Sequence, residues 1–318
     1  MVKLTVGVLR GGPSSEYDVS LKTGQSVLAD FPHDKYRPLD IWVSKAGEWH
    51  AGGLVSAPEK ILRSVDVVFN AMHGEYGEDG RVQRVLEMHG VPFTGSESWP
   101  SFLAMHKVMA RETFKQAGLK IPAGMVVKKG YDSAEVTRRA VRDIGPAWVV
   151  KPARRGSSIG VSIVNGPDEL PKALEKAFAE DSMVLVEKRV KGREATVAVL
   201  ENFRGEKLYA FPAVEIVPPK NKFFDYEVKY NGATQEICPG RFDAKTKLAL
   251  QEAAKLAHQA LGCRHYSRSD FIVSKTGIYI LETNTLPGLT SESLFPKAAA
   301  SVGLRFPQLI EHLISIAV

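Results

Sequence analysis

The polar residues best suited to chemistry lie in one stretch, YSRSDFIVSKTGIYILETNTLPG, at 266–288. Apolar runs at 271–273 and 278–281 flank the short turn Lys275-Thr276-Gly277 and predict a β-hairpin. In a hairpin symmetric about Thr276, Ser274 faces Ile278 and Ile272 faces Ile280. Because side chains alternate along a strand, one face at the open end then gathers Arg268, Asp270, Glu282 and Asn284. The opposite face, predicted to be core, carries Phe271, Val273, Tyr279 and Leu281.

Two carboxylates and a carboxamide at this spacing have the chemistry of a magnesium site, because Mg²⁺ prefers hard oxygen ligands and keeps positions for water and phosphate. Arg268 could then bind a phosphate or a developing oxyanion beside the metal. The alternative is a solvated hairpin end with a cross-strand Arg–Glu pair. A register slip of one residue would also disperse the cluster.

A second set of residues suggests phosphate binding. KPARRGSSIG, at 151–160, follows the apolar run 148–150 and combines a lysine with glycines and serines. It is not the usual nucleotide loop, because the lysine precedes the glycines. Farther along, Glu187 and Lys188 end an apolar strand and Glu194 follows them, so they could contact a base and a ribose. Charged residues at strand ends are, however, usually just solvated.

The elements that must position these residues form three blocks. Residues 1–95 alternate strands and helices, which predicts a parallel α/β sheet; residues 96–190 mix short strands with helices; and residues 191–318 read as α+β. Strands are expected near 3–9, 39–43, 65–70, 193–200 and 207–217. Helices are expected after a serine cap near 15, and at 81–88, Pro100 to Ala117, 132–142, 168–179, 243–261 and through Leu309, Ile310, Leu313 and Ile316.

Composition narrows the function classes. The 318 residues are 44% hydrophobic and 25% charged, with a net charge of +6. The adjacent basic residues at 128–129, 138–139 and 154–155 are isolated pairs, whereas nucleic-acid binders concentrate basic residues, so a small anionic ligand is favoured over nucleic acid. Two cysteines without C-x-x-C spacing favour a reducing cytoplasm. No apolar run predicts a signal peptide or a membrane span.

Taken in order, seven blocks resemble the D-alanine–D-alanine ligases of the ATP-grasp superfamily. They are GGPSSEYDVS (11–20), HGEYGEDG (73–80), KPARRGSSIG (151–160), Glu187-Lys188 with Glu194, FFDYEVKY (223–230), SRSD (267–270) and ETNTLPGLTSESL (282–294). The resemblance implies an ATP-grasp fold, in which an N-terminal parallel-sheet domain precedes two α+β subdomains that sandwich ATP.

The resemblance also implies an ATP site. Lys107 and Lys151 would reach the phosphates, and residues 154–160, with Ser158, would form a mobile glycine-rich flap. Adenine would be bound by Glu187, Lys188 and the Val190 backbone, ribose by Glu194, and the base pocket lined by Phe223 and Leu281. Asp270, Glu282 and Asn284 match the family's Mg²⁺ ligands, and Mn²⁺ is a substitute ion.

For the amino acids, Glu16 matches the carboxylate that anchors the first D-alanine, with Val19 and His73 beside it. With Glu16, Ser157 and Tyr230 match a triad that latches the loop 218–235 over the site. Arg268 and the Gly288 N–H would form the oxyanion hole, Ser293 and Leu294 would hold the second D-alanine, and Lys229 would touch the transferred phosphate. Taken singly, each residue has an ordinary structural explanation; Glu16, for example, could simply stabilise a helix start.

The implied function is ATP-dependent synthesis of D-alanyl-D-alanine through an acyl phosphate, for peptidoglycan precursors, by a cytoplasmic homodimer. The nearest alternative is a ligase for D-lactate or D-serine as second substrate; Tyr230 favours the dipeptide over D-lactate. A non-catalytic nucleotide sensor should lack some of the metal ligands, and a carboxylase-type enzyme would need a biotin or bicarbonate site. Three positions depart from the family pattern and leave substrate tuning open: His106, Arg189 and Ser267. Arg155 adds a cation to the flap.

Overall fold

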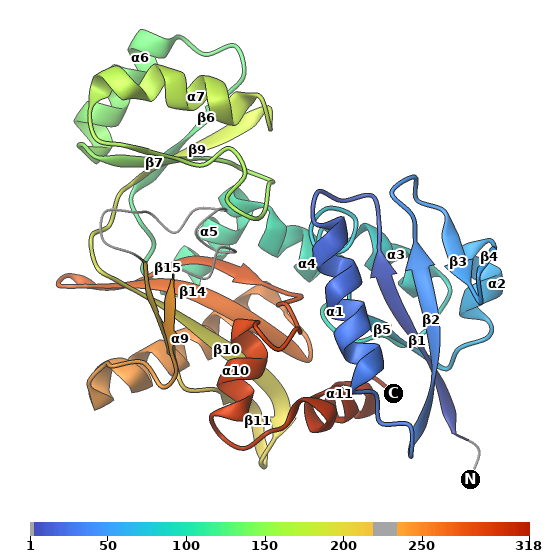
Figure 1. Cartoon of the computed structure of the whole chain (residues 1–318). Coiled ribbons are helices and arrows are strands. Elements are labelled where there is room, and N and C mark those ends of the chain that lie inside the picture. The colour runs from blue at the N-terminus through green and yellow to red at the C-terminus, as the bar shows by residue number, and fades with distance from the viewer. Residues whose placement is uncertain (1–2, 219–233) are drawn as a thin grey trace.

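The computed structural model describes residues 3–218 and 234–318, which fold around three sheets (Figure 1). The first sheet has the order β4-β3-β2-β1-β5. Its strands are β1 (Leu4–Gly11), β2 (Tyr36–Val43), β3 (Trp49–Ala51), β4 (Leu54–Val55) and β5 (Val67–Asn70). β1 pairs in parallel with β2 and β5, but β2, β3 and β4 pair antiparallel. The prediction of a parallel sheet is therefore right for the three strands around β1 and wrong for the β3–β4 edge.

Five helices accompany or follow this sheet: α1 (Tyr17–Ala29), α2 (Pro58–Leu62), α3 (Arg81–Met88), α4 (Ser98–Met105) and α5 (Lys107–Gln116). The expected serine cap of α1 is wrong, because the cap residue is Glu16 and no side-chain cap bond forms. The expected single helix from Pro100 to Ala117 is also wrong. It is broken at His106, whose ψ of 87° leaves the helical region and whose ring accepts a hydrogen bond from the Met109 N–H at the start of α5.

The second sheet is antiparallel, with the order β6-β9-β7-β8. Its strands are β6 (Gly124–Lys128), β7 (Trp148–Pro152), β8 (Ser162–Val164) and β9 (Met183–Lys188), and its helices are α6 (Ser133–Arg139), extended by a π-helical turn to Ile144, and α7 (Leu170–Phe178), preceded by a 3₁₀ turn from Pro167. Trp148 and Val150 pack under the helices. Because side chains alternate, Val149 and Lys151 point to the opposite face.

The third sheet runs β13-β12-β10-β14-β15, with β11 also paired to β10. Its strands are β10 (Arg193–Phe203), β11 (Glu206–Ala210), β12 (Val214–Val217), β13 (Gln235–Ile237), β14 (Tyr266–Ser274) and β15 (Gly277–Asn284), and its helices are α9 (Ala244–Leu261), α10 (Leu294–Ala300) and α11 (Phe306–Ser315). The strand expected over 207–217 is two strands, separated around Pro212, which has no N–H to donate to a ladder.

The first and third sheets share one hydrophobic core. Val6, Val8 and Phe69 of the first sheet lie in the same buried cluster as Ala198 and Leu200 of β10. The last helix, α11, completes this cluster through its buried residues Leu309, Ile310, Leu313 and Ile314. The second sheet instead has a core of its own, built with α6 and α7. This sheet and its two helices lie at the top of Figure 1.

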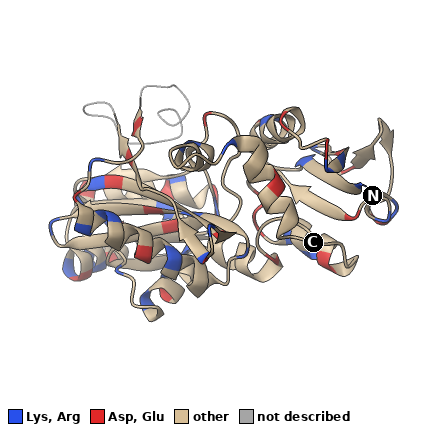
Figure 2. Ribbon diagram, turned by 90° about the horizontal axis from the view of Figure 1, so that it is seen from below, with Lys and Arg blue, Asp and Glu red and all other residues tan. Residues whose placement is uncertain are grey.

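Charged residues are spread over the elements. In Figure 2 the lysines and arginines are interspersed with aspartates and glutamates over the ribbon of the described residues. Across residues 3–218 and 234–318, no helix combines the length and apolarity that crossing a membrane requires.

Candidate active site

The hairpin of β14 and β15 brings the predicted polar cluster together. Arg268 pairs with Asn284 and Asp270 pairs with Glu282, as predicted. Toward the turn the predicted pairs are wrong, because the register shifts at Asp270 and Phe271. Phe271 faces Ile280, and Ser274 faces Gly277. A β-bulge, which inserts one extra residue into one strand, therefore lies just beyond the polar cluster.

The bulge changes which residues of β15 face the core. Ile280 is 1% exposed and packs in the core with Phe271, whereas Leu281 lines the cleft. The prediction that Tyr279 and Leu281 are core residues is wrong. The Tyr279 ring instead lies under the Lys120 ammonium, at 4.8 Å from the ring centroid. Leu281 thus lies in the cleft, and the base-pocket role that the family resemblance implied for it stays a prediction.

Arg268 and Asp270 form the centre of the cluster. The Arg268 Nε and Nη2 each donate a hydrogen bond of 3.1 Å to the Asp270 carboxylate, which also accepts one of 2.5 Å from the Thr196 hydroxyl on β10. Burial by itself would lower the pKa of Arg268, but Asp270 and Glu282 outweigh burial and raise that pKa. Arg268 is therefore a permanently charged group, held in place by a carboxylate.

Two further oxygen donors lie on β15. The Glu282 carboxylate is 3.2 Å from the Lys107 ammonium, which comes from the start of α5. The Asn284 side-chain oxygen accepts a hydrogen bond of 2.8 Å from the Leu286 N–H, which fixes the orientation of its amide. Together with Asp270 they form a set of hard oxygen donors, two charged and one neutral, on one face of the hairpin.

Across the cleft, Lys151 of β7 forms an ion pair with Glu187 of β9. The same carboxylate pairs with Arg111 of α5 and is only 3% exposed. Lys188, next along β9, donates a hydrogen bond of 3.2 Å to the Ile144 carbonyl. Lys151 and Glu187 thus both line the cleft, and each already has a charged partner.

The flap, residues 154–160, connects β7 to β8, and its residues 155–158 line the cleft. Ser157 and Ser158 have φ values of 49° and 60°, in the left-handed region that side chains rarely adopt. The Lys107 ammonium donates a hydrogen bond of 2.9 Å to the Arg155 carbonyl. Lys107 therefore bridges the flap and the hairpin, since its second partner is Glu282.

Glu16 lies at the N-terminal end of α1, beside the flap. Burial raises the pKa of the Glu16 carboxyl and so does the nearby Glu78, whereas hydrogen bonding by Ser157 and the proximity of His73 act in the opposite direction. His73 is 4% exposed, and its ring contacts the Thr23 hydroxyl at 2.8 Å and Glu78 at 3.1 Å. Glu16 is thus a shielded carboxylate that a ligand cation could neutralise.

The loop after β15 closes the other end of the cleft. Gly288 lies against Ser293, so that a Cβ at Gly288 would approach the Ser293 hydroxyl to 2.8 Å. Ser293 caps α10 by its position, and its hydroxyl is held by the Thr290 N–H at 3.1 Å and the Thr290 hydroxyl at 2.8 Å. Leu294 is the first residue of α10. A helix N-terminus with free N–H groups favours a carboxylate ligand.

All these groups line one cleft of about 1850 Å³, which has room for a nucleotide and small substrates together. Its lining includes every site residue predicted from the sequence within the described ranges: Glu16, Val19, His73, Lys107, Lys151, Ser157, Ser158, Glu187, Lys188, Val190, Glu194, Arg268, Asp270, Leu281, Glu282, Asn284, Gly288, Ser293 and Leu294. Phe223, Lys229 and Tyr230 lie outside the described residues.

Sequence reasoning missed several residues that hold the site together. Arg111 lies one helical turn after Lys107, so an i, i+4 pair of cations on α5 was the available signal. Thr196 orients Asp270 from a neighbouring strand, and Glu75 contacts the flap from the loop after β5. Thr196 is positioned by strand pairing and Glu75 by a contact between two loops, and no local sequence pattern predicts either position.

The structure also locates the three departures from the family pattern. His106 caps α5, as described above. Ser267 is fully buried, with its hydroxyl 2.8 Å from the His258 ring, on the face of β14 opposite to Arg268. Arg189 lines the cleft and donates a hydrogen bond of 3.2 Å to Asn165. Of the three, only Arg189 lines the cleft.

Two α+β units that face each other across a cleft, with a lysine-bearing strand on one and a carboxylate-bearing hairpin on the other, define an ATP-grasp ligase. Comparison with known proteins narrows this class. Residues 113–315 match the family model described as D-ala D-ala ligase C-terminus, and residues 53–96 match D-ala D-ala ligase N-terminus. The chain belongs to the D-alanine–D-alanine ligase family.

Individual relatives cover the whole chain. It is 43% identical over 317 residues to the D-alanine–D-alanine ligase of Syntrophobacter fumaroxidans, which covers 99% of this chain and 98% of the relative. It is 42% identical to that of Geobacter sulfurreducens, covering 97% and 92%. Among solved structures, the VanG D-Ala:D-Ser ligase from Enterococcus faecalis matches over 100% of both chains, with a TM-score of 0.87 and 31% identity. The D-alanine–D-alanine ligase from Coxiella burnetii has the same fold, with a TM-score of 0.85 at 24% identity over 99% of this chain and 94% of that one.

Proposed function

We propose that this protein joins two molecules of D-alanine to D-alanyl-D-alanine, with conversion of ATP to ADP and phosphate, in the synthesis of peptidoglycan precursors. The observation that carries the proposal is the face of the β14–β15 hairpin, where Arg268, Asp270, Glu282 and Asn284 lie together opposite Lys151. Full-length relatives with this activity in their names support the same reaction.

Each part of the cleft has a task in this reaction. Lys107 and Lys151 bind the phosphates of ATP, Glu187, Lys188 and the Val190 backbone bind adenine, and Glu194 binds ribose. Leu281 lines the base pocket, and the same role stays a prediction for Phe223, which lies outside the described residues. Glu16 binds the ammonium group of the first D-alanine, with Val19 and His73 beside it. The helix start at Ser293 and Leu294 binds the second carboxylate.

The reaction then proceeds in two steps. The carboxylate of the first D-alanine attacks the γ-phosphate, which gives an acyl phosphate and ADP. The amine of the second D-alanine attacks the acyl carbon, and the tetrahedral intermediate expels phosphate. Arg268 and the Gly288 N–H stabilise the oxyanion of that intermediate, because fixed donors already aimed at the developing charge lower the barrier. By the family resemblance, Lys229 would contact the transferred phosphate and Tyr230, with Glu16 and Ser157, would latch a loop; Lys229 and Tyr230 lie outside the described residues, so these two roles stay predictions.

The oxygen donors of the hairpin fit Mg²⁺, with Mn²⁺ as a substitute. The hard ligands on this face are Asp270, Glu282 and Asn284. Three protein ligands leave the other coordination positions of Mg²⁺ for water and phosphate. Within residues 3–218 and 234–318 no three carboxylate, histidine or cysteine ligands converge, and the proposed set combines two carboxylates with the amide of Asn284. When bound, the ion would neutralise phosphate charge. Asp270 would hold it while still bonded to Arg268 and Thr196.

An isotope experiment tests the acyl phosphate. D-Alanine whose carboxylate carries heavy oxygen is incubated with the protein, ATP and Mg²⁺, and the released phosphate is analysed by mass spectrometry. The proposal requires one heavy oxygen in each phosphate, since the carboxylate oxygen bonded to phosphorus leaves with it. Dipeptide formation with unlabelled phosphate would refute the two-step route.

A second candidate concerns the second substrate. The structural similarity to a D-Ala:D-Ser ligase at 31% identity favours a test of D-serine, and D-lactate is the other alternative. Equal concentrations of D-alanine and D-serine, or of D-alanine and D-lactate, are supplied with ATP across a range of pH, and the products are weighed by mass spectrometry. We expect D-alanyl-D-alanine to dominate. A predominance of the mixed product would assign the chain to the alternative.

We also propose a homodimer in the cytoplasm. Met88 at the end of α3 and Trp99 and Phe102 of α4 are 75%, 59% and 39% exposed, and the Trp99 and Phe102 rings stack with centroids 5.7 Å apart. Exposed apolar groups in proximity favour an interface. Light scattering should report twice the chain mass, and a monomer at working concentration would contradict this. The two free cysteines, Cys238 and Cys263, agree with a reducing compartment.

A further inference from the structure

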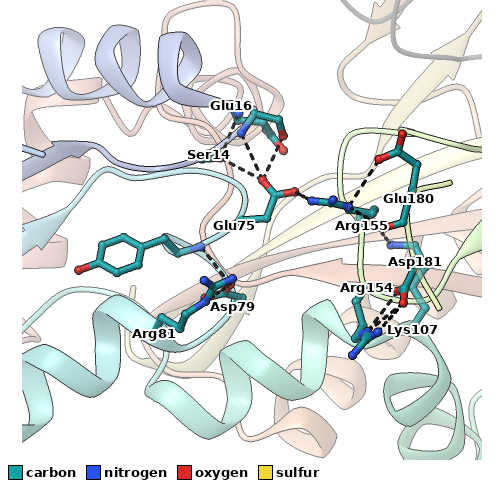
Figure 3. Close-up of polar contacts among 12 residues, drawn as sticks. Ser14, Glu16, Glu75, Asp79, Arg81, Lys107, Arg154, Arg155, Glu180 and Asp181 are labelled. Atoms are coloured by element: carbon teal, nitrogen blue, oxygen red, sulfur yellow. Dashed lines mark hydrogen bonds and ion pairs between the residues drawn. The ribbon is translucent and has the colours of Figure 1, made fainter. Parts of the chain in front are cut away.

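A charged pair joins the flap to the N-terminal sheet. The Arg155 guanidinium, from the flap, forms an ion pair with Glu75, in the loop that follows β5 (Figure 3). Their side chains are 36% and 19% exposed, so water reaches the pair only in part. The two residues come from different sheets and are 80 positions apart in the chain. The pair can therefore form only when the flap lies against the N-terminal part.

Glu75 also holds the segment that begins α1. While one of its carboxylate oxygens takes Arg155, the other accepts hydrogen bonds from the Ser15 hydroxyl at 3.0 Å, the Ser15 N–H at 3.3 Å and the Ser14 hydroxyl at 3.3 Å. The Ser14 hydroxyl in turn accepts a bond of 3.0 Å from the Glu16 N–H. Figure 3 shows Glu75 between these groups and Arg155. Through Ser14, Glu75 thus helps to position Glu16, the residue proposed to bind the first D-alanine.

Arg155 is equally well connected on the flap side. Its Nε donates a hydrogen bond of 3.2 Å to the Glu180 carbonyl, and its own carbonyl accepts the bond from Lys107. The next residue, Gly156, lies so close to Glu16 that a Cβ there would be 3.3 Å from the carboxylate. The flap backbone at Arg155 and Gly156 therefore lies beside both the lysine proposed for phosphate and the proposed substrate carboxylate.

We propose that Glu75 and Arg155 are positioning residues that act as a clasp: they couple closure of the flap over the phosphates of ATP to the binding of the first D-alanine at Glu16. The inference rests on the proposed function. Neither residue is among those proposed above to bind substrate, although Arg155 lines the cleft. The clasp acts through the Ser14 and Ser15 bonds on one side and through the Arg155 carbonyl on the other, so that a displaced flap would loosen both sites at once.

The test is a double-mutant cycle of Glu75→Gln, Arg155→Gln and the double variant, with ADP release as the assay. A glutamine at 75 can keep one oxygen for the two serines, but it loses the charge and places an NH2 donor where the oxygen faced Arg155. We expect each single variant to raise KM for D-alanine about 3–10-fold with kcat changed less than about 2-fold, the split produced by loss of binding interactions. The double variant should be no worse than either single variant, because coupled residues are not additive. Unchanged KM, or additive effects, would overturn the clasp.

Arg154→Gln is the matched control. Arg154 neighbours Arg155 in the flap but pairs with Asp181, within its own sheet unit. This variant removes a flap ion pair of the same kind without cutting the link to the N-terminal part. We expect a lower unfolding temperature and an unchanged KM for D-alanine. If Arg154→Gln raised KM as much as Arg155→Gln, flap stability rather than the clasp would explain both results.

A measurement without turnover separates this inference from the proposed function. Amide hydrogen exchange of residues 154–160 is followed in the ATP-bound protein, in wild type and in Glu75→Gln. We expect faster exchange in the variant, because the flap opens more often once the clasp is lost. Equal exchange rates would overturn the clasp even in an active enzyme. A wild type that releases no ADP with D-alanine would instead overturn the proposed function.

Discussion

Arg268 and Asp270 lie two residues apart on β14 and are joined by two hydrogen bonds of 3.1 Å. Residues at this spacing share one face of a strand, so the cation and its carboxylate are fixed side by side by the sheet. The fork geometry of the guanidinium suits a carboxylate or a phosphate oxygen. Arg268 is therefore oriented before any substrate binds, which is the condition for efficient stabilisation of an oxyanion.

Replacing Arg268 by alanine should remove turnover and spare ATP binding. Loss of one oxyanion donor typically lowers kcat by about 10²–10³-fold. ADP release measures the first effect, and titration with a non-hydrolysable ATP analogue measures the second. Arg138→Ala is the control, since Arg138 is an exposed residue paired with Glu135 away from the cleft. Turnover of Arg268→Ala close to wild type would remove Arg268 from the mechanism.

Replacing Asp270 by asparagine should raise the Mg²⁺ requirement. Mutation of a residue that only hydrogen-bonds to a metal ligand typically lowers metal affinity about 10–100-fold. Loss of a charged ligand itself should lower the affinity for Mg²⁺ at least as much. The measurement is the Mg²⁺ concentration at half-maximal ADP release, after treatment with a chelator. Asp243→Asn, at the cap of α9, is the matched control. An unchanged Mg²⁺ requirement would show that Asp270 serves only to hold Arg268.

As the pH is lowered, kcat/KM for D-alanine should begin to fall at a higher pH than it would if Glu16 had the pKa of an ordinary glutamate. Burial, followed by the charge of Glu78, raises the pKa of Glu16. Below that raised pKa the carboxyl is neutral and no longer attracts an ammonium group, so kcat/KM for D-alanine falls as the pH falls. A pH profile of kcat/KM measures the pH at which this acidic decrease occurs. In Glu16→Gln the acidic decrease should vanish, along with most of the affinity for D-alanine. An acidic decrease that is retained in this variant would belong to another group.

His265 should make the fold less stable in acid. Burial, assisted by Arg264, lowers the pKa of His265 to about 4, and the ring accepts a hydrogen bond of 3.1 Å from the Gly95 N–H. The unfolded chain takes up the proton near pH 6.5, before the folded one does. The free energy of unfolding therefore falls by about 1.4 kcal/mol per pH unit between about pH 6.5 and 4.

Urea unfolding at several pH values tests this slope against His265→Asn. Asparagine tolerates the φ of 66° found at this position and carries an acceptor that does not titrate. The variant should be less stable near neutral pH but should lose less stability in acid. Parallel pH curves for the two proteins would mean that other groups, such as the carboxylates, dominate acid unfolding.

Local sequence signals predicted much of the architecture. The pairing of Asp270 with Glu282 followed from the turn position and strand alternation, and the α3 bounds matched the expected 81–88. The bulge that sends Leu281 to the cleft could not be predicted, because it depends on packing of Ile280 against Phe271. The sequence predicts a single helix across His106 and a single strand across Pro212, because hydrophobic periodicity continues through a short interruption of the backbone. Both predictions are wrong for this reason.

Long-range contacts set the limit for the site. The sequence predicts which residues gather in the cleft only through the resemblance to a family, since Glu16, Lys151 and Arg268 lie on three separate sheets or their loops. Their charged partners were not foreseen. Arg111 beside Glu187 and Glu75 beside Arg155 are pairs of residues about 80 positions apart, and no local pattern encodes such a pairing.

The most direct test is ADP release by the purified protein with Mg²⁺ and ATP, compared with D-alanine, with L-alanine and without an amino acid. The account predicts release that depends on D-alanine, with an equal amount of D-alanyl-D-alanine found by mass spectrometry. ATP binding without D-alanine-dependent ADP release would contradict it, and would turn attention to Ser267, His106 and Arg189 as determinants of a different substrate.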